Sequence, residues 1–287
     1  MPAHSSPTVK RRRLAAELRS YRDRVGLTIE EVAQRLEWST AKISRIENAR
    51  VSVLPRDVKF LIGVYGVEEN GEEWESLLTL ARESRQKGWW HAYGDAIPEG
   101  FETYVGLEAD ATTLRTYESE YVPGLLQNAD YAHAVIRATM LTASDEEIER
   151  HVAVRMVRQE RLTGPGAPEI WAVISEAVIR RVVGGELVMR AQLSRLAETS
   201  KQPNVTLQVL PFSVGAHAGM DGAFMILGFP APTDPDVTYV HYYTGTLYLE
   251  KPEDLARYTL MFDHLRAAAL PVDQSRDLIA CVRDELA

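Results

Sequence analysis

Residues 27–48 have the sequence LTIEEVAQRLEWSTAKISRIEN, and the expected arrangement of the N-terminal part follows from it. Thr28 is followed three residues later by Glu31, the pattern of a capping box, so a helix should begin here. Ser39 or Thr40 can cap a second helix. Only Glu37 and Trp38 separate the two. Two short helices around so tight a turn predict a helix-turn-helix unit.

The second helix of this unit is predicted to have two different faces. Ile43 and Ile46 recur at helical spacing and should be buried, which turns Arg45 and Asn48 outward. An outward face that is polar, small and basic is what a helix needs to contact base edges in the major groove of DNA. The side chains on that face and at its flanks are Thr40, Ala41, Lys42, Ser44, Arg45 and Asn48.

Further helices are expected on both sides of the unit. Apolar residues recur at helical spacing over 14–25, and Gly26 can end that helix. A fourth helix is predicted from Pro55 to Tyr65 and a fifth over 72–86. Residues 1–9 are expected to form a disordered arm, 10–70 the helix-turn-helix domain, 71–90 a linker helix and 91–287 a larger domain.

Phosphate contacts are predicted at helix starts and at basic residues, because backbone N–H groups and guanidinium groups bind phosphate oxygens. The basic run over 10–13 has two equally good interpretations: it contacts phosphates, or it is the solvent-exposed start of a helix. The expected phosphate-contacting residues are Arg11, Arg12, Arg13, Thr28, Ser39, Ser44 and Arg50.

Residues 27–33 and 39–48 resemble the lambda-repressor and Cro-like helix-turn-helix family, often called Xre-type. The resemblance implies that four residues contact bases, three by position and Lys42 by adjacency: Thr40, Ala41, Lys42 and Arg45. It also implies a structural ion pair between Arg22 and Glu47. Ile29, Glu37 and Ala49 depart from residues common in the family. A left-handed backbone at Glu37 costs on the order of 1 kcal/mol.

Charge is distributed unevenly along the chain. The net charge is -9, yet residues 1–60 hold 13 Lys/Arg against 7 Asp/Glu, a local charge of +6. The other 227 residues hold 19 against 34, a charge of -15. A basic module on an acidic body can bind phosphate while the body resists nonspecific coating of DNA.

Several classes of protein are not expected. No apolar run is long enough for a membrane span and the N-terminus lacks the apolar core of a signal peptide, which predicts a cytoplasmic, nucleoid-associated protein without membrane partners. The single Cys281 permits no internal disulfide. Histidines are scattered, and the sequence has no phosphate-cradling Gly-Lys-Ser/Thr and no Gly-x-Ser-x-Gly motif. We therefore expect no enzyme activity, no metal and no cofactor.

The larger domain changes from helical to strand-like patterns. Helices are predicted over 104–118, 128–140, 145–162, 175–183, 185–199, 252–269 and 272–286. Runs rich in Val, Ile, Tyr and Thr predict five short strands: 170–174, 205–210, 223–229, 237–243 and 246–249. The expected fold class is mainly α and multidomain: an all-α helix-turn-helix bundle, then an α+β domain with a small antiparallel sheet and helices on one face.

This domain resembles that of actinomycete Xre-type regulators with a C-terminal Scr1-type domain, including WhiJ-like regulators. The segments that carry the resemblance are 88–90, 104–109, 121–127, 131–132 and 209–212. The resemblance implies a regulator of development or specialised metabolism, often with a small protein encoded by a neighbouring gene as partner.

Dimerisation is expected, since paired half-sites multiply affinity for double-stranded operator DNA. The larger domain would then sense either a protein partner or a small molecule. The alternatives are a pure protein-interaction scaffold and an enzyme fused to a DNA-binding module. Candidate effector or partner residues are Trp89, Trp90, Tyr121, Pro123, Leu126, Gln127 and His217. The competing interpretation of 121–127 is a buried connector between two helices. In the competing interpretation of Trp89 and Trp90, the two rings only hold the domains together by packing. For His217 the competing interpretation is an ordinary loop without a binding role.

Overall fold

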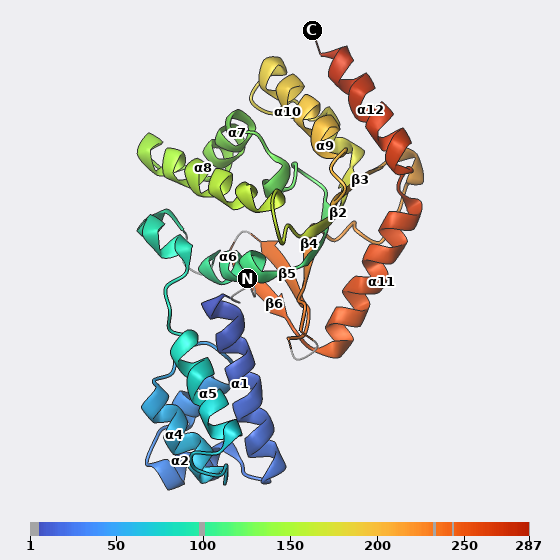
Figure 1. The fold of residues 1–287 in the computed structure, drawn as a ribbon. Helices are drawn as coiled ribbons and strands as arrows, with labels where there is room; N and C mark the ends of the chain where they lie inside the picture. Colours follow the sequence, from blue (N-terminus) through green and yellow to red (C-terminus); the bar gives the residue numbers. More distant parts are fainter. Residues whose placement is uncertain (1–5, 98–100, 232–233, 243, 287) are drawn as a thin grey trace. The chain divides into compact units, whose positions relative to one another are not determined.

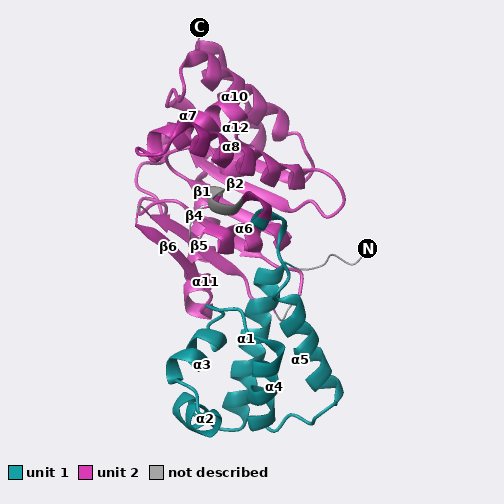
Figure 2. Cartoon of the chain, turned by 90° about the vertical axis from the view of Figure 1, so that its left-hand side faces the viewer, with its two compact units in different colours: residues 1–91 teal, residues 92–287 magenta. Residues whose placement is uncertain are grey.

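The chain divides into two compact units in a computed structural model, which describes residues 6–97, 101–231, 234–242 and 244–286. The first unit covers Met1–His91 and the second Ala92–Ala287 (Figure 2). The boundary lies one residue beyond the position expected from the sequence. The expected class, an all-α helix-turn-helix bundle followed by an α+β domain, is confirmed.

The first unit contains, among its described residues, five α-helices around one core (Figure 1). They are α1 (Pro7–Arg24), α2 (Ile29–Leu36), α3 (Thr40–Glu47), α4 (Pro55–Val64) and α5 (Glu72–Glu83). Trp74 and Leu78 of α5 are buried in the same core as Leu14 and Leu18 of α1. The expected linker helix is therefore part of the first unit, because its apolar face packs into that unit's core.

The first helix begins earlier than predicted. Ser6 is its N-cap and accepts a hydrogen bond from the N–H of Val9 at 3.4 Å, and Pro7 follows at the first helical position. Proline is favoured there because its fixed φ suits a helix start. The expected disordered arm over 1–9 is thus wrong for residues 7–9, while residues 1–5 lie outside the described chain.

Both helices of the helix-turn-helix end on left-handed residues that carry a Cβ atom. Glu37 after α2 and Ala49 after α3 each have φ of 54°. The N–H of Trp38 donates to the carbonyl of Ala33 at 2.9 Å, which closes the end of α2. The left-handed turn predicted at Glu37 is confirmed.

The second unit combines helices with one sheet. Its α-helices are α6 (Phe101–Asp110), α7 (Ala129–Thr139), α8 (Asp145–Gln159), α9 (Glu176–Arg180), α10 (Glu186–Thr199), α11 (Pro252–Ala268) and α12 (Val272–Glu285). Its strands are β1 (Thr113–Glu118), β2 (Glu169–Ser175), β3 (Val205–Leu210), β4 (Phe224–Gly228), β5 (Val237–Tyr242) and β6 (Gly245–Leu249). Short 3-10 turns are η1 (Trp89–Ala96), at the boundary between the units, and η2 (Gly124–Leu126), η3 (Glu160–Leu162) and η4 (Phe212–Val214).

The sheet is mixed, which corrects the antiparallel expectation. In the described chain its six strands have the order β3-β2-β1-β4-β5-β6. β1 pairs in parallel with β2, and β2 with β3, whereas β4 to β6 form the expected antiparallel meander. Parallel neighbours need long crossovers, and α7 to α10 provide them. The strand β1 lies where the sequence predicted the end of a helix.

Helices cover both faces of the sheet, not one as expected (Figure 1). On one face Phe262 of α11 packs with Tyr117 of β1. On the other face the Tyr104 ring of α6 lies 4.4 Å from the ring of Tyr239, centroid to centroid. Within the described segments no helix is long and apolar enough to cross a membrane.

Candidate nucleic-acid interface

The start of α3 presents small and polar groups to solvent. Ser39 caps the helix, and its Oγ accepts from the N–H of Lys42 at 3.2 Å. Thr40 and Ala41 follow in the first turn and are exposed, while Ile43 is fully buried. No acidic residue occupies this turn. The positive end of the helix dipole is therefore open to an anionic polymer.

Arg45 lies on the same outward side of α3. Its side chain is exposed, and it forms no ion pair with any residue that the structure describes. Arg50, just beyond the helix, is likewise exposed. An exposed guanidinium on a helix that also presents Thr40 and Ala41 has the donor geometry to contact a guanine edge.

Lys42 is held differently from Arg45. Its Nζ lies 3.3 Å from the centroid of the Trp38 ring and 3.1 Å from Oδ2 of Asp57 on α4. The ammonium group is thus engaged by a cation–π contact and an ion pair. The Lys42 side chain thereby ties α3 to α4, and base contact by Lys42, as by Thr40, Ala41 and Arg45, stays a prediction.

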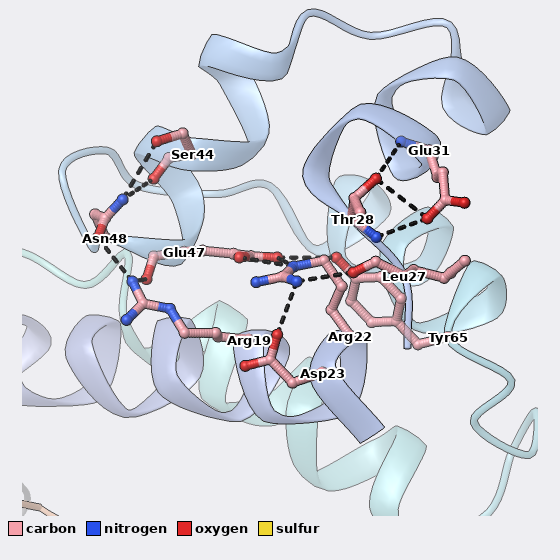
Figure 3. A network of polar contacts seen from close by, with 10 residues as sticks. All are labelled: Arg19, Arg22, Asp23, Leu27, Thr28, Glu31, Ser44, Glu47, Asn48 and Tyr65. Atoms are coloured by element: carbon pink, nitrogen blue, oxygen red, sulfur yellow. Dashed lines mark hydrogen bonds and ion pairs between the residues drawn. The ribbon is translucent and has the colours of Figure 1, made fainter. Parts of the chain in front are cut away.

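A buried ion pair fixes the orientation of α3 (Figure 3). Nε of Arg22 lies 2.9 Å from Oε1 and 3.0 Å from Oε2 of Glu47, which is 3% exposed. Nη1 of Arg22 donates to the carbonyl of Leu27 at 2.8 Å, and the Tyr65 hydroxyl donates to Glu47 at 3.2 Å. The pair expected between Arg22 and Glu47 is present, and it links α1, α3 and the start of α2.

The electrostatics of this cluster follow from burial and pairing. The hydrogen bond to Glu47 raises the pKa of Arg22 above its usual value. Burial, and then the negative charge of Glu47, raise the pKa of Tyr65 well above its ordinary value of 10.0. Tyr65 therefore stays a neutral donor to the carboxylate at any physiological pH.

Sequence reasoning missed a second set of contacts that holds α3. Nη2 of Arg19 donates to the carbonyl of Glu47 at 3.0 Å and to Oδ1 of Asn48 at 2.7 Å (Figure 3). Arg19 precedes Arg22 by three residues, so both lie on one side of α1. The three-residue spacing of Arg19 and Arg22 is the sequence feature from which this contact could have been predicted. The contacts of Arg19 neutralise carbonyl charge at the C-terminal end of α3.

Three of the residues predicted to contact phosphate already use their side-chain oxygens in hydrogen bonds within the helix-turn-helix unit. The capping box at Thr28 is confirmed: its N–H donates to Oε2 of Glu31 at 2.8 Å, and its Oγ1 accepts from the N–H of Glu31 at 3.2 Å. Glu31 also places a carboxylate in this first turn. Ser44 is partly buried, and its Oγ accepts from Asn48 at 3.3 Å. Ser39 is exposed, but its Oγ is used in the cap of α3.

The basic run lies on the first turns of α1, far along that helix from Arg19 and Arg22. Arg13 lines a groove of about 720 Å³ between α1 and α5, together with Glu17, Glu72, Glu73, Glu75 and Glu83. Figure 2 shows α3 and α5 on opposite sides of α1. Arg13 thus lies among acidic side chains, and its phosphate contact stays a prediction. For Arg11 and Arg12 phosphate contact stays a prediction.

The turn over 121–127 is an internal connector in the second unit. Gln127 is fully buried, and its Nε2 donates to the carbonyl of Val122 at 2.6 Å. Pro123 and Leu126 are also buried, whereas Tyr121 keeps partial exposure. Buried side chains cannot form an exposed partner surface. The expectation for Pro123, Leu126 and Gln127 is therefore corrected in favour of the connector interpretation.

The remaining candidate residues lie in two separate places. Trp90 is buried and packs edge-to-face on the exposed Trp89, with ring centroids 6.1 Å apart. Gly88 lies against the Trp90 ring so closely that a Cβ atom there would be 2.3 Å from it. His217 packs on the ring of Tyr117, and its Nδ1 accepts from the N–H of Gly219 at 3.1 Å.

Comparisons with known proteins divide the chain in the same way. Residues 13–75 match the model of a family described as a helix-turn-helix domain. Residues 101–281, more than half of the chain, match the family described as a domain of unknown function, DUF5753. The chain has no significant match among curated proteins or solved structures. The chain thus belongs to the DUF5753 family and carries a helix-turn-helix domain in front of that domain.

Proposed function

We propose that this protein is a sequence-specific, DNA-binding transcriptional regulator that inserts α3 into the major groove of double-stranded DNA. The observation that carries the proposal is that α3 exposes Thr40, Ala41 and Arg45 while Arg22 and Glu47 fix its orientation from behind. A rigid helix with exposed polar groups is the geometry that base readout requires.

The regulator acts as a homodimer on paired half-sites. A single helix-turn-helix buries little surface on DNA, and a second copy multiplies affinity when both half-sites are engaged. Light scattering of the free protein and of its complex with operator DNA measures the stoichiometry. Two chains per operator support this proposal, and one chain per operator contradicts it.

The second unit senses a signal and transmits it to the DNA-binding unit. One mechanism is a small molecule that binds one dimer geometry better than another. The other is a basic partner protein encoded by a neighbouring gene, which suits the charge of -15 on residues 61–287. Pull-down of neighbouring gene products together with operator binding separates these mechanisms, because only the second gives a stoichiometric protein complex.

The finer classification rests on the sequence motifs. Residues 27–48 support an Xre-type, lambda-repressor-like subtype, and the segments around 88–90 and 121–127 support kinship with Scr1-type, WhiJ-like regulators of actinomycetes. We further propose a cytoplasmic, nucleoid-associated protein without catalytic activity. A screen of the full chain against nucleotide and ester substrates tests the last point, and any turnover contradicts it.

A genome-wide map of binding sites tests the proposed function in the cell. Discrete sites upstream of genes that share one sequence motif are the expected result. Occupancy without a shared motif, or equal occupancy by an Arg45→Ala variant, would contradict sequence-specific regulation through α3.

A further inference from the structure

The two edges of the six-stranded sheet are finished in different ways. At the β3 edge both backbone groups of Val209 are bonded: its N–H donates to Oγ of Ser275 at 2.9 Å, and its carbonyl accepts from the N–H of Leu270 at 2.9 Å. Nε2 of Gln208 also donates to the carbonyl of Leu270 at 2.9 Å. The segment that leads into α12 thus covers the outer side of β3, which blocks a further strand from pairing there.

The β6 edge has no strand on its outer side. β6 is last in the order of the sheet, and β5 is the one strand that pairs with it among the described residues (Figure 2). In an antiparallel pair, alternate residues direct their N–H and carbonyl groups towards the neighbouring strand. The remaining residues of β6 therefore direct theirs away from β5, where the described chain supplies no strand to receive them.

The sequence of this edge lacks the features that usually prevent pairing. Exposed edge strands are commonly protected by charged side chains, by proline or by a bulge. Residues 242–249 contain no Asp, Glu, Lys, Arg or Pro. The register of β5 and β6 runs without a bulge from the pair of Tyr242 and Gly245 to the pair of Thr238 and Leu249. An uncharged, regular strand of Thr, Leu and Tyr residues is suited to accept a partner strand.

Apolar side chains at this edge stay exposed on one face of the sheet. Leu247 stands opposite Val240 of β5, so both point to the face on which α11 packs. Val240 packs against the core under α11, whereas Leu247 keeps 44% of its surface exposed and Tyr242 keeps 45%. The Tyr242 side chain leans over Gly245, where an added Cβ atom would lie 3.6 Å from its hydroxyl oxygen. An apolar strip of Tyr242, Leu247 and Leu249 therefore borders the β6 edge.

We propose that β6 is a dimer interface: it pairs antiparallel with β6 of a second copy of this chain, with the two-fold axis at Leu247, and joins two sheets into one. The proposal deepens the homodimer proposed above and rests on it. A two-fold axis brings identical surfaces together, so each must complement itself. An antiparallel edge strand does so, because the outward N–H groups of one copy meet the outward carbonyl groups of the other.

The order of side chains along β6 favours this register. With the axis at Leu247, the two Leu247 side chains meet at the centre, and Gly245 of each copy lies opposite Leu249 of the other. The Tyr242 side chain, which leans over Gly245, then extends to Leu249 of the second copy. The apolar strips of the two copies are thereby buried against each other, which stabilises the dimer.

Charge also favours a second copy at this edge. Residues 61–287 carry a charge of -15, so two copies of this acidic body repel each other. Like charges directly opposite each other across two strands destabilise a sheet. The uncharged run over 242–249 places none there, whatever the register. In the register proposed, Thr246 lies opposite Tyr248 of the second copy, and pairs of β-branched and aromatic residues stabilise sheets.

Sedimentation equilibrium of the full chain, free and with operator DNA, measures the dissociation constant of the dimer. The parent chain should dimerise. Leu247→Lys places two ammonium groups opposite each other at the axis, so its dissociation constant should rise at least about tenfold. Leu187→Lys is the matched control, because Leu187 is 81% exposed on α10, and it should dimerise like the parent chain. Thermal melting followed by circular dichroism identifies any variant that does not fold.

Disulfide cross-linking tests the register in folded chains that carry Cys281→Ser, so that the introduced thiol is the one cysteine present. The Cβ atoms of directly opposite residues lie about 4.5–5.5 Å apart, so Leu247→Cys chains should link to each other on mild oxidation. Leu249→Cys chains are the control. Their two thiols are four residues apart along the strands, about 13 Å, and should not link.

The outcomes separate this interface from the proposed function. A parent chain that stays monomeric, free and on operator DNA, overturns the interface together with the homodimer, and leaves the β6 edge to a strand from another protein. A dimer that persists in Leu247→Lys and is not linked in Leu247→Cys overturns the interface and leaves the homodimer. Dimers that depend on Leu247 but bind no DNA support the interface and remove the regulatory function.

Discussion

Arg22 on α1 and Glu47 on α3 form a buried ion pair in which Nε of the arginine lies 2.9 Å and 3.0 Å from the two carboxylate oxygens. The pair joins α3 to α1, the longest described helix of its unit. Since Tyr65 also donates to Glu47, the carboxylate has partners from two elements. The orientation of α3 therefore depends on a buried contact behind its exposed face.

Loss of the arginine should destabilise the first unit strongly. Arg22→Met leaves the Glu47 charge buried and unmatched, so the free energy of unfolding should fall by about 3–5 kcal/mol. Arg35→Met, at an exposed position on α2, is the control and should change it by less than about 0.5 kcal/mol. Chemical denaturation measures both. The double variant Arg22→Met, Glu47→Met should lose less than the single one, and equal losses in Arg22→Met and the control would argue against this role.

Lys42 should matter more for stability than for base readout. Its Nζ lies 3.1 Å from Asp57 and over the Trp38 ring, so Lys42→Ala removes an ion pair and a cation–π contact worth about 1 kcal/mol together. The ratio of specific to nonspecific DNA affinity should stay within about threefold of the parent value. Fluorescence anisotropy with operator and scrambled duplexes measures the ratio. A loss as large as that of Arg45→Ala would show instead that Lys42 contributes to base readout.

The turn of the helix-turn-helix carries measurable strain. Glu37 adopts φ of 54°, where a Cβ atom is unfavourable and glycine is not. Glu37→Gly should therefore be more stable than Glu37→Ala by about 1 kcal/mol in the free energy of unfolding. The alanine variant is the control, because it removes the charge but keeps the Cβ atom. Equal stability of the two variants would show that the turn is unstrained.

Stability should depend on pH through Glu118. Burial at the end of β1 raises its pKa to about 8 in the folded chain from an ordinary value of 4.5, so between these values the folded state binds more protons than the unfolded state. The free energy of unfolding should then decrease as pH rises from 4.5 to 8, by at most about 1.4 kcal/mol per pH unit, and level off above. The groups facing it are Arg155, Tyr121, Tyr131 and Tyr239, which all titrate at higher pH. Glu118→Gln should remove this decrease of the free energy of unfolding between pH 4.5 and 8. An unchanged pH profile in that variant would contradict the role given to Glu118.

Local sequence signals predicted most of the fold because they act over a few residues. The capping box of Thr28 and Glu31 places the start of α2, and the strand patterns over 205–210 and 237–243 correspond to β3 and β5. The strand β1 was missed because Leu107, Ala111 and Leu114 continue a helical spacing into it. Both faces of β1 are covered, and the alternation of buried and half-buried residues holds only over 113–116 because Thr116 and Tyr117 are both buried.

Long-range contacts explain what sequence patterns left out. The parallel pairing of β1 with β2 depends on residues more than fifty positions apart, which no local period reports. The same holds for the site. The exposed face of α3 could be predicted from its spacing, but the contact between Lys42 and Asp57 arises only when separate elements pack together.

The most direct measurement selects duplexes that the full chain binds from a random DNA library, and then compares its affinity for the selected duplex and for a scrambled one at matched salt. Sequence-specific readout through α3 predicts a preference of at least about a thousandfold. In Arg45→Ala the specific affinity should fall by about 1–3 kcal/mol, while Arg82→Ala, an equal loss of charge on α5, should retain the preference. Equal affinity for both duplexes in the parent chain would contradict the central claim.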